Sequence, residues 1–161
     1  MEHDTEPAGE LAGELAVPPG QRLVLRTDGA SRGNPGRAAA GIVIEMEDGT
    51  SVATGKRYLG ILTNNQAEYR ALILGLLAVA RYKPAAVHIY MDSELIVRQM
   101  RGEYRVKDES LRSLHEEAAG RVRRLSEATI EHVLRSGNVQ ADKLANAALD
   151  EQARQAGADR G

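Results

Sequence analysis

Residues 23–36 read LVLRTDGASRGNPG, an apolar run that ends in a single acid and a glycine-rich turn. The run Leu23–Leu25 is typical of a buried strand, and Asp28 stands where that strand is expected to end. A carboxylate in this position is unfavourable unless it is paired or binds a metal ion. Gly33-Asn34-Pro35-Gly36 then predicts a tight turn. Asp28 is therefore the first candidate functional residue.

The segments that follow this stretch alternate as in an α/β domain. Apolar patterns predict strands at 22–28, 39–46, 51–59, 86–91 and 128–134. They predict helices at 64–82, from the cap Ser93 to Met100, at 109–125 and at 138–153. Three hairpin-connected strands followed by α-β-α-β-α predict a mixed five-stranded sheet, with three antiparallel strands, then two parallel ones, and helices on both faces.

Local signals support these boundaries. Asp48-Gly49 is a hairpin turn sequence between the second and third strands. Thr63 and Gln66 have the spacing of a capping box at the start of the longest helix. Asn138 is the expected cap of the last helix.

The length of 161 residues fits one domain, which we place at residues 21–153. The acidic residues 1–20 are expected to form a disordered N-terminal tail, and residues 154–161 a flexible C-terminal tail. The chain has no cysteine, no long apolar stretch and no leader-like start, so we expect no membrane association and a cytoplasmic location. We also expect a monomer.

The charge and the aromatic content limit how a nucleic acid can be bound. A net charge of −2 gives no global sign of a polyanion-binding protein, so affinity for nucleic acid must come from a local basic face or from metal ions. Five tyrosines, with no Trp or Phe, leave few platforms on which bases could stack. Recognition through splayed bases is therefore disfavoured.

Three further acids occupy settings like that of Asp28. Glu68 begins the longest helix, Asp92 follows the fourth strand, and Asp142 lies in the second turn of the last helix. Any one of them alone can be a helix-start acid or a solvated surface group. Together they suggest a cluster of carboxylates that repel each other, and divalent cations would relieve this repulsion. Oxygen ligands in a chain without cysteine favour Mg²⁺ or Mn²⁺ over zinc.

Four motifs resemble those of the ribonuclease H family, type 1. They are Asp-Gly-x-x-x-Gly-Asn-Pro-Gly from Asp28, Thr-Asn-Asn-x-x-Glu from Thr63, Met91-Asp92-Ser93, and Ala-Asp-x-Leu-Ala from Ala141. The resemblance covers residues 22–150 and implies the ribonuclease H-like fold. It also implies that the four carboxylates hold two Mg²⁺ ions, with Mn²⁺ as a possible substitute, and that no organic cofactor is needed. Two such ions about 3.5–4 Å apart can hold the attacking water and the leaving oxygen.

The resemblance further implies a set of residues in the substrate groove. These are Gly29, Gly33, Asn34, Asn64, Asn65 and Ser93. Most have a plainer alternative, because Gly33 and Asn34 suit a turn, and Asn64, Asn65 and Ser93 suit helix capping.

Two departures from the family pattern concern cations near the site. His132 comes three residues too early for the family's catalytic histidine and is interpreted as packed within a strand. Arg135 stands in the likelier place, as in the shorter archaeal-like members, and can stabilise charge on the scissile phosphate. Residues 101–127 contain arginines but no Trp, and interspersed acids dilute the charge, which weakens the case for a basic substrate-binding protrusion.

The sequence thus predicts an endonuclease that hydrolyses the RNA strand of RNA–DNA hybrids by a two-metal-ion mechanism, leaving 5′-phosphate and 3′-hydroxyl ends. The alternative is a non-catalytic ribonuclease H-like module that binds nucleic acid or a partner protein. A third possibility is a related nuclease that acts on DNA junctions or double-stranded RNA.

Overall fold

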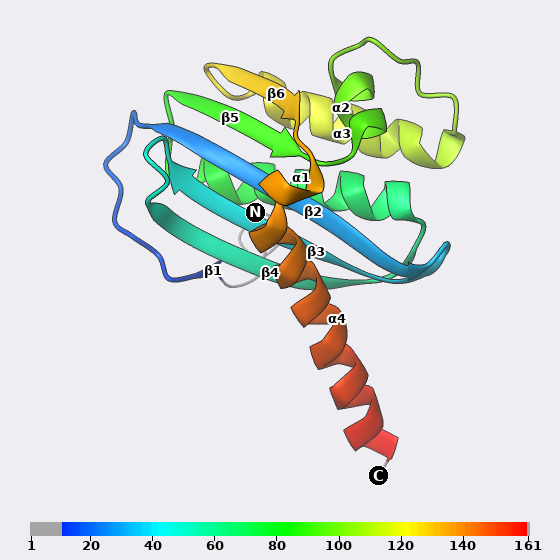
Figure 1. Ribbon diagram of the computed structural model, residues 1–161. Helices are drawn as coiled ribbons and strands as arrows, with labels where there is room; N and C mark the ends of the chain where they lie inside the picture. The colour runs from blue at the N-terminus through cyan, green and yellow to red at the C-terminus, as the bar shows by residue number, and fades with distance from the viewer. Residues whose placement is uncertain (1–10, 161) are drawn as a thin grey trace.

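A computed structural model of the protein describes residues 11–160. Its elements are β1 (Leu11–Ala12), β2 (Arg22–Gly33), β3 (Gly36–Met46), β4 (Ser51–Leu62), α1 (Asn64–Ala80), β5 (Ala86–Met91), α2 (Glu94–Met100), α3 (Glu109–Arg123), β6 (Ala128–His132), the 3-10 turn η2 (Arg135–Gly137) and α4 (Val139–Arg160). The strands form one sheet in the order β1-β4-β3-β2-β5-β6 (Figure 1).

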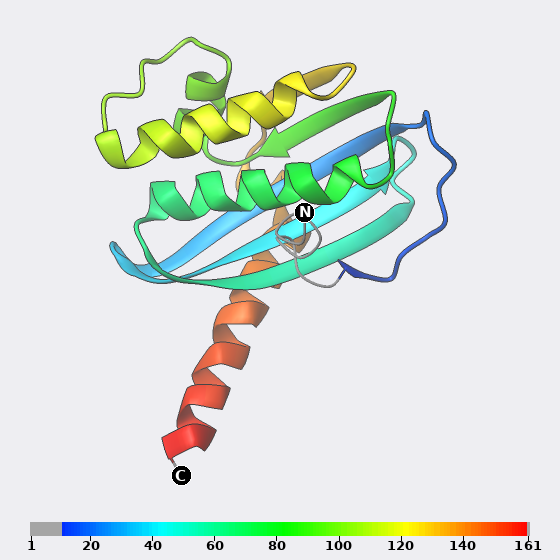
Figure 2. The same cartoon turned by 180° about the vertical axis from the view of Figure 1, so that it is seen from behind.

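The central pairings are the expected ones. β2, β3 and β4 are antiparallel, whereas β5 pairs in parallel with β2, and β6 pairs in parallel with β5. α4 crosses one face of the sheet, and its C-terminal half extends beyond the sheet (Figure 1). α1 crosses the other face, with α3 beside it (Figure 2). The predicted mixed sheet with helices on both faces is thus confirmed.

The main core lies between the sheet and α1. Leu25 and Ile42 from the sheet and Leu72 from α1 are fully buried there. Tyr69 is the one buried aromatic side chain among the described residues, and its hydroxyl donates to Gln99 Oε1 of α2 at 2.7 Å. Because Leu, Ile, Val and Ala fill most of this layer, α1 can approach the sheet closely.

The predicted local signals are present. Thr63 Oγ1 accepts from the Gln66 N–H at 3.2 Å, and Gln66 Oε1 accepts from the Thr63 N–H at 2.9 Å, which completes the capping box. Asp48 Oδ1 accepts from the Thr50 N–H, and Gly49 has a φ of +91°, as the turn between β3 and β4 requires.

The N-terminal segment corrects the expectation of a five-stranded sheet and of a disordered tail. β1 pairs with β4 at Thr54 and Gly55 as a sixth strand, and the Leu15 N–H donates to the Val52 carbonyl at 2.8 Å. Val17 packs against the core. This pairing satisfies backbone groups of β4 that would otherwise form an open sheet edge. Residues 11–20 are therefore placed on the domain, whereas the rest of the predicted tail, residues 1–10, lies outside the described residues.

The C-terminal helix corrects the expected boundary at residue 153. α4 continues to Arg160 because the residues after 153 are mostly good helix formers. Two ion pairs tie its middle to the sheet, Arg32 with Asp150 at 2.8 Å and Lys56 with Glu151. No helix among residues 11–160 is both long enough and apolar enough to cross a membrane.

Candidate active site

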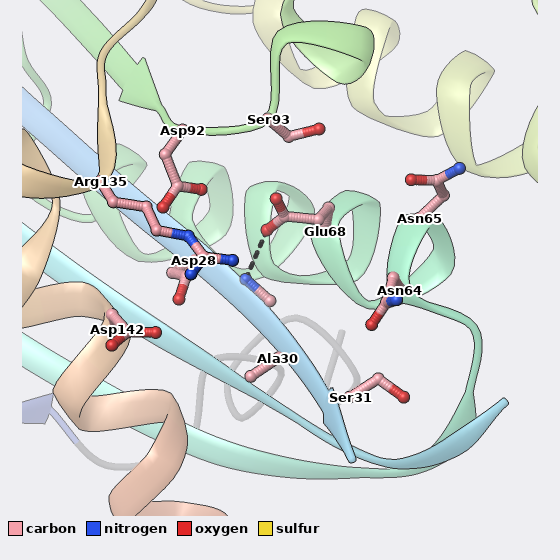
Figure 3. Close-up of a pocket in the computed structure, with 11 residues that line it drawn as sticks. Asp28, Ala30, Ser31, Asn64, Asn65, Glu68, Asp92, Ser93, Arg135 and Asp142 are labelled. Atoms are coloured by element: carbon pink, nitrogen blue, oxygen red, sulfur yellow. Dashed lines mark hydrogen bonds between the residues drawn. The ribbon is translucent and has the colours of Figure 1, made fainter. Parts of the chain in front are cut away.

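Three of the four predicted acids converge at one end of the parallel strand pair. Asp28, Glu68 and Asp92 each offer a carboxylate oxygen, and these atoms lie within 4.8 Å of one another (Figure 3). Asp28 belongs to β2, Glu68 to α1, and Asp92 follows β5 directly. A strand, a helix and the residue directly after a second strand therefore position the cluster, which favours a preorganised site.

The pairing of β2 explains why Asp28 lies in this cluster. β5 pairs with β2 only as far as Arg26, whereas β3 pairs with β2 as far as Gly33. The expectation that Asp28 ends its strand is therefore wrong, because β2 continues to Gly33. Backbone hydrogen bonds to β3 maintain this part of the strand, and they do not require apolar side chains. Asp28 lies where the neighbour β5 ends, and this end leaves room for Glu68 and Asp92.

Gly29 allows α1 to approach β2 at this point. A Cβ atom at Gly29 would lie 2.3 Å from the carbonyl oxygen of Ala67, so only glycine permits the observed contact. The Gly29 N–H donates to Glu68 Oε1 at 2.6 Å (Figure 3). Gly29 lines the cavity, as a predicted substrate contact should, and it also holds the Glu68 carboxylate in place.

Asp142 approaches the cluster from the opposite face of the sheet. It is exposed and lies in the first turn of α4, which begins at Val139, and not in the second turn as expected. A Cβ atom at Gly41, which pairs with Asp28, would lie 2.0 Å from the Ala141 carbonyl oxygen. This close packing of α4 brings the Asp142 carboxylate near Asp28 without making it part of the group of three.

The predicted cap of α4 is only partly confirmed. Asn138 directly precedes the helix and is buried, but its side chain does not cap it. Its Nδ2 donates to the Thr27 carbonyl of β2 at 2.9 Å, and its Oδ1 has no hydrogen-bond partner among the described residues. Asn138 thus attaches the start of α4 to the sheet.

Burial and mutual repulsion raise the proton affinity of the cluster. Asp28 and Glu68 are only 5% and 8% exposed. Burial raises the pKa of Asp28 to about 9, and repulsion from Glu68 and Asp92 contributes to the rise. Burial also raises the pKa of Glu68 to about 8, although the hydrogen bond from Gly29 acts in the opposite direction. The pKa of Asp92 is likewise raised by burial.

Arg135 is a cation beside these carboxylates. Its side chain extends from the segment before α4 into the cavity (Figure 3). Its charge lowers the pKa of Glu68 and of Asp92, which partly offsets the effect of burial. His132 ends β6 and is exposed, so the interpretation of His132 as a packed residue is wrong. The reason is that β6 is an edge strand and ends there.

The cavity over the cluster has a volume of about 390 Å³. Its lining residues are Asp28, Gly29, Ala30, Ser31, Asn64, Asn65, Glu68, Asp92, Ser93, Arg135 and Asp142. Thr63 caps α1, so Asn64 and Asn65 are not needed as side-chain caps, and they line the cavity instead. Ser93 lines the cavity and also caps α2, accepting from the Ile96 N–H.

Gly33 and Asn34 are not among the lining residues. Both lie at the turn between β2 and β3, and Asn34 Oδ1 accepts from the Asn64 N–H at 3.0 Å. Asn34 thus connects this turn to the start of α1. The sequence analysis did not identify Ala30 and Ser31 as lining residues. Alternate side chains of a strand lie on the same face, so Ala30 could have been expected from its position two residues after Asp28.

The donor set fits a divalent cation. Three carboxyl groups converge here although burial and mutual repulsion oppose their ionisation, and their hard oxygen ligands suit Mg²⁺ or Mn²⁺. A cation there favours the ionised form of each acid.

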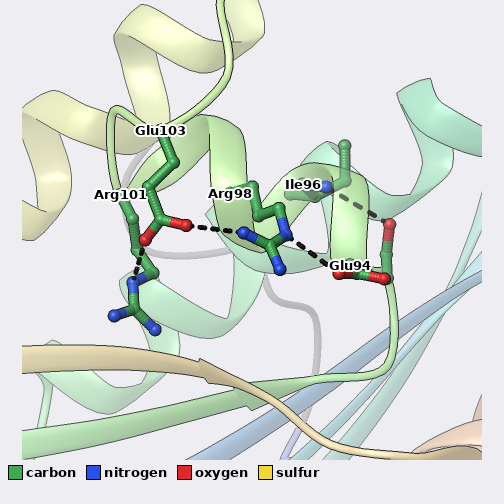
Figure 4. Close-up of polar contacts among 6 residues, drawn as sticks. Glu94, Ile96, Arg98, Arg101 and Glu103 are labelled. Atoms are coloured by element: carbon green, nitrogen blue, oxygen red, sulfur yellow. Dashed lines mark hydrogen bonds and ion pairs between the residues drawn. The ribbon is translucent and has the colours of Figure 1, made fainter.

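Two arginines at the end of α2 and directly after it, Arg98 and Arg101, form ion pairs with nearby acids. Arg98 pairs with Glu94 and with Glu103, both at 2.9 Å, and Arg101 pairs with Glu103 at 2.9 Å (Figure 4). The Arg98 guanidinium also lies 5.3 Å from the centre of the Tyr104 ring. This group, which we call the Arg98 cluster, folds the connection between α2 and α3 back on α2.

Comparison of the sequence with known proteins identifies relatives over most of the chain. A family profile described as reverse transcriptase-like matches residues 26–148. Ribonuclease HI of Halobacterium salinarum is 42% identical over 132 residues, which cover 82% of this chain and 66% of that protein. The bifunctional protein Rv2228c of Mycobacterium tuberculosis is 40% identical over 139 residues, or 86% of this chain, but the chain spans only 38% of the length of that relative.

Solved structures agree with this assignment. Ribonuclease H1 of Halobacterium salinarum matches with a TM-score of 0.79 at 42% identity, covering 81% of this chain and 98% of that one. LC11 ribonuclease H1, solved in complex with an RNA/DNA hybrid, matches with a TM-score of 0.78 at 38% identity, with the same coverage of 81% and 98%. The sequence motifs, the fold and these relatives agree, and the chain belongs to the type 1 ribonuclease H family.

Proposed function

We propose that this chain is a metal-dependent endonuclease that hydrolyses the RNA strand of RNA–DNA hybrids. One observation supports this most directly. Three carboxylates meet within 4.8 Å at the floor of an open cavity, although burial and repulsion both oppose their charge. Such an arrangement is unfavourable in itself and is typical of a site that binds divalent cations.

Asp28, Glu68 and Asp92 would hold a divalent cation between them, and Asp142 with Asp28 would hold a second one. The bound cations would supply Lewis-acid polarisation of the scissile phosphodiester. We expect Mg²⁺, with Mn²⁺ as a substitute, and products with 5′-phosphate and 3′-hydroxyl ends, as in the family.

Besides the bound cations, the Arg135 side chain would contribute a positive charge to the site. It is placed in the cavity beside Glu68 and Asp92, and its guanidinium can donate to the phosphate oxygens of the strand being cut. Because an arginine stays protonated, it stabilises charge without relaying a proton.

The rim of the cavity suits recognition of the RNA strand. Ser31, Asn64, Asn65 and Ser93 place short hydroxyl and amide groups around the carboxylates. Such groups can contact 2′-hydroxyls across the wide minor groove of a hybrid. The absence of Trp and Phe from the chain also favours a paired substrate over splayed bases.

A cleavage assay tests the proposal. Labelled hybrid, duplex RNA, duplex DNA and a DNA junction are each incubated with the protein and Mg²⁺, Mn²⁺ or EDTA. We expect cleavage of the RNA strand of the hybrid alone, with either metal and not with EDTA. Binding of the hybrid without cleavage under all conditions would favour the alternative of a non-catalytic module. Cleavage of duplex RNA or of the junction would redirect the substrate assignment.

A further inference from the structure

Arg26 lies on β2 two residues before Asp28, and its side chain is held on three sides. Its Nε donates to Glu45 Oε1 of β3 at 2.9 Å, and its guanidinium carbon lies 4.8 Å from the centre of the Tyr90 ring of β5. Its Nη1 donates to the Gly137 carbonyl at 2.8 Å. The first two contacts fix the guanidinium, so that the third is directed at the 3-10 turn.

The Gly137 carbonyl ends the turn η2, which carries Arg135 at its other end. The hydrogen bonds within this region, from the Gly137 N–H to Leu134 and from the Asn138 N–H to Arg135, close the turn but do not attach it to the sheet. Before the turn, the Val133 N–H donates to the Met91 carbonyl at the end of β5. The C-terminal end of the turn is held by the Arg26 side chain and by Asn138 Nδ2, which donates to the Thr27 carbonyl. Both of these contacts are made with β2.

Three consecutive residues of β2 therefore define the geometry of the site. Arg26 and Thr27 hold the turn that carries Arg135, and Asp28 is the central carboxylate. Arg135 itself is exposed, and its side chain forms no hydrogen bond with any other residue between 11 and 160. Its direction into the cavity therefore depends on the backbone that carries it.

We propose that Arg26 is a positioning residue, which holds the turn Arg135–Gly137 so that the Arg135 guanidinium stays over the carboxylates. This role rests on the proposed hydrolytic function. Arg26 does not line the cavity, so its effect on catalysis passes through Arg135.

The decisive experiment is a double-mutant cycle on hybrid cleavage. Arg26→Met keeps an unbranched stem like that of arginine and removes the guanidinium with its donors, and it should lower kcat by roughly tenfold in the wild-type background, as expected when a catalytic group is misplaced. In an Arg135→Ala background the same change should lower kcat less than about twofold, because residues that act through one group are not additive. Arg26→Lys, which keeps one charged donor, should recover part of kcat.

Arg22→Met is the matched control. Arg22 begins the same strand and makes exposed ion pairs with Glu127 and Glu47, far along β2 from the cavity. It should leave kcat unchanged. Equal losses from Arg26→Met in both backgrounds would overturn the proposal, since they would show that Arg26 acts independently of Arg135. A wild-type kcat in Arg26→Met would overturn it as well.

A measurement without substrate separates this proposal from the proposed function. Backbone ¹⁵N relaxation of Ser136, Gly137 and Asn138 should show increased motion in Arg26→Met and little change in Arg22→Met. Unchanged relaxation would overturn the positioning role even if the protein cleaves hybrids. If the wild type fails to cleave, the proposed function fails, while the relaxation data still decide whether Arg26 holds the turn. Should Arg26→Met not fold, the smaller loss of kcat expected from Arg26→Lys is measured in the wild-type and Arg135→Ala backgrounds instead, and it should again disappear in the second.

Discussion

Two groups of acidic side chains stand almost next to each other in the sequence and differ in how their charge is balanced. Asp92 belongs to the buried site with Asp28 and Glu68, whereas Glu94, two residues later, belongs to the exposed Arg98 cluster. In the Arg98 cluster, Glu94 and Glu103 each form an ion pair with Arg98 at a distance of 2.9 Å. In the site, Arg135 only partly offsets three carboxylates whose pKa values are raised.

The difference shows which acids are available for chemistry. Exposed ion pairs contribute little to stability, because solvent already screens the charges. Buried like charges destabilise the folded state, and that free energy becomes available when a cation or a proton binds. Changes in the site should therefore have large effects on activity and on pH dependence, and changes in the Arg98 cluster should have small ones.

The largest expected effect follows from Asp28→Asn. The change removes the carboxylate that the other acids surround and keeps the side-chain volume, so cleavage should fall below detection while the fold persists. The melting temperature in EDTA should rise, because repulsion in the site is relieved. Activity is measured on labelled hybrid and folding by circular dichroism. Turnover within about tenfold of the wild type would show that Asp28 is not essential.

A smaller loss is expected from Arg135→Ala. A preorganised donor contributes about 2–4 kcal/mol to transition-state stabilisation, so kcat should fall by about 30- to 1000-fold without reaching zero. Arg135→His should retain part of the activity. His132→Ala is the control and should be nearly silent, because His132 is exposed and outside the cavity. The roles of the two residues would be exchanged if only His132→Ala abolished turnover.

The third prediction concerns the pH dependence of stability without metal. The folded-state pKa values of Asp28, about 9, and of Glu68, about 8, are above those of the unfolded chain. The folded state therefore retains protons that the unfolded chain has released, and this stabilisation is lost as the pH rises toward 9. In EDTA, the melting temperature should be several degrees lower at pH 9 than at pH 6. Mg²⁺ should reduce this difference, and so should Asp28→Asn. A flat profile in EDTA would mean that the acids do not repel each other as the structure indicates.

The smallest effect is expected in the Arg98 cluster. Glu103→Gln removes a charge that pairs with Arg98 and Arg101, and these side chains are well exposed. The free energy of unfolding, measured by urea denaturation, should change by less than about 1 kcal/mol, with kcat unchanged. A loss of activity would indicate that this cluster shapes the substrate groove, and the contrast with the site would no longer hold.

The sequence predicts much of this architecture because its signals are local. The capping box at Thr63, the turn at Asp48-Gly49 and the apolar strands are each encoded within a few neighbouring residues. The strand β1 could not be predicted, because two residues paired with a distant edge leave no periodic pattern. The continuation of β2 past Asp28 was hidden for a related reason, since only its pairing with β3 maintains it.

The site shows the same division. The four acids, Asn64 and Asn65 lie in recognisable motifs, and Arg135 was predicted from its position after the last strand; the structure places all of them at one cavity. The contacts of Arg26 with Gly137 and of Asn138 with Thr27 join residues 111 positions apart, and no local pattern indicates them. Asn34 lies outside this cavity, and its motif does not reveal that its side chain binds the backbone of α1.

The close contact at Gly41 has a consequence for thermal motion. Side chains that separate a helix from a sheet can change rotamer and let the helix shift by small steps. At Gly41, the backbone of β3 meets the backbone of α4 at Ala141 directly, and neither has a rotamer to change. Fluctuations of Asp142 relative to Asp28 therefore require the whole start of α4 to move. The spacing of the backbone at these two positions should vary less over time than the exposed position of Asp142 would suggest.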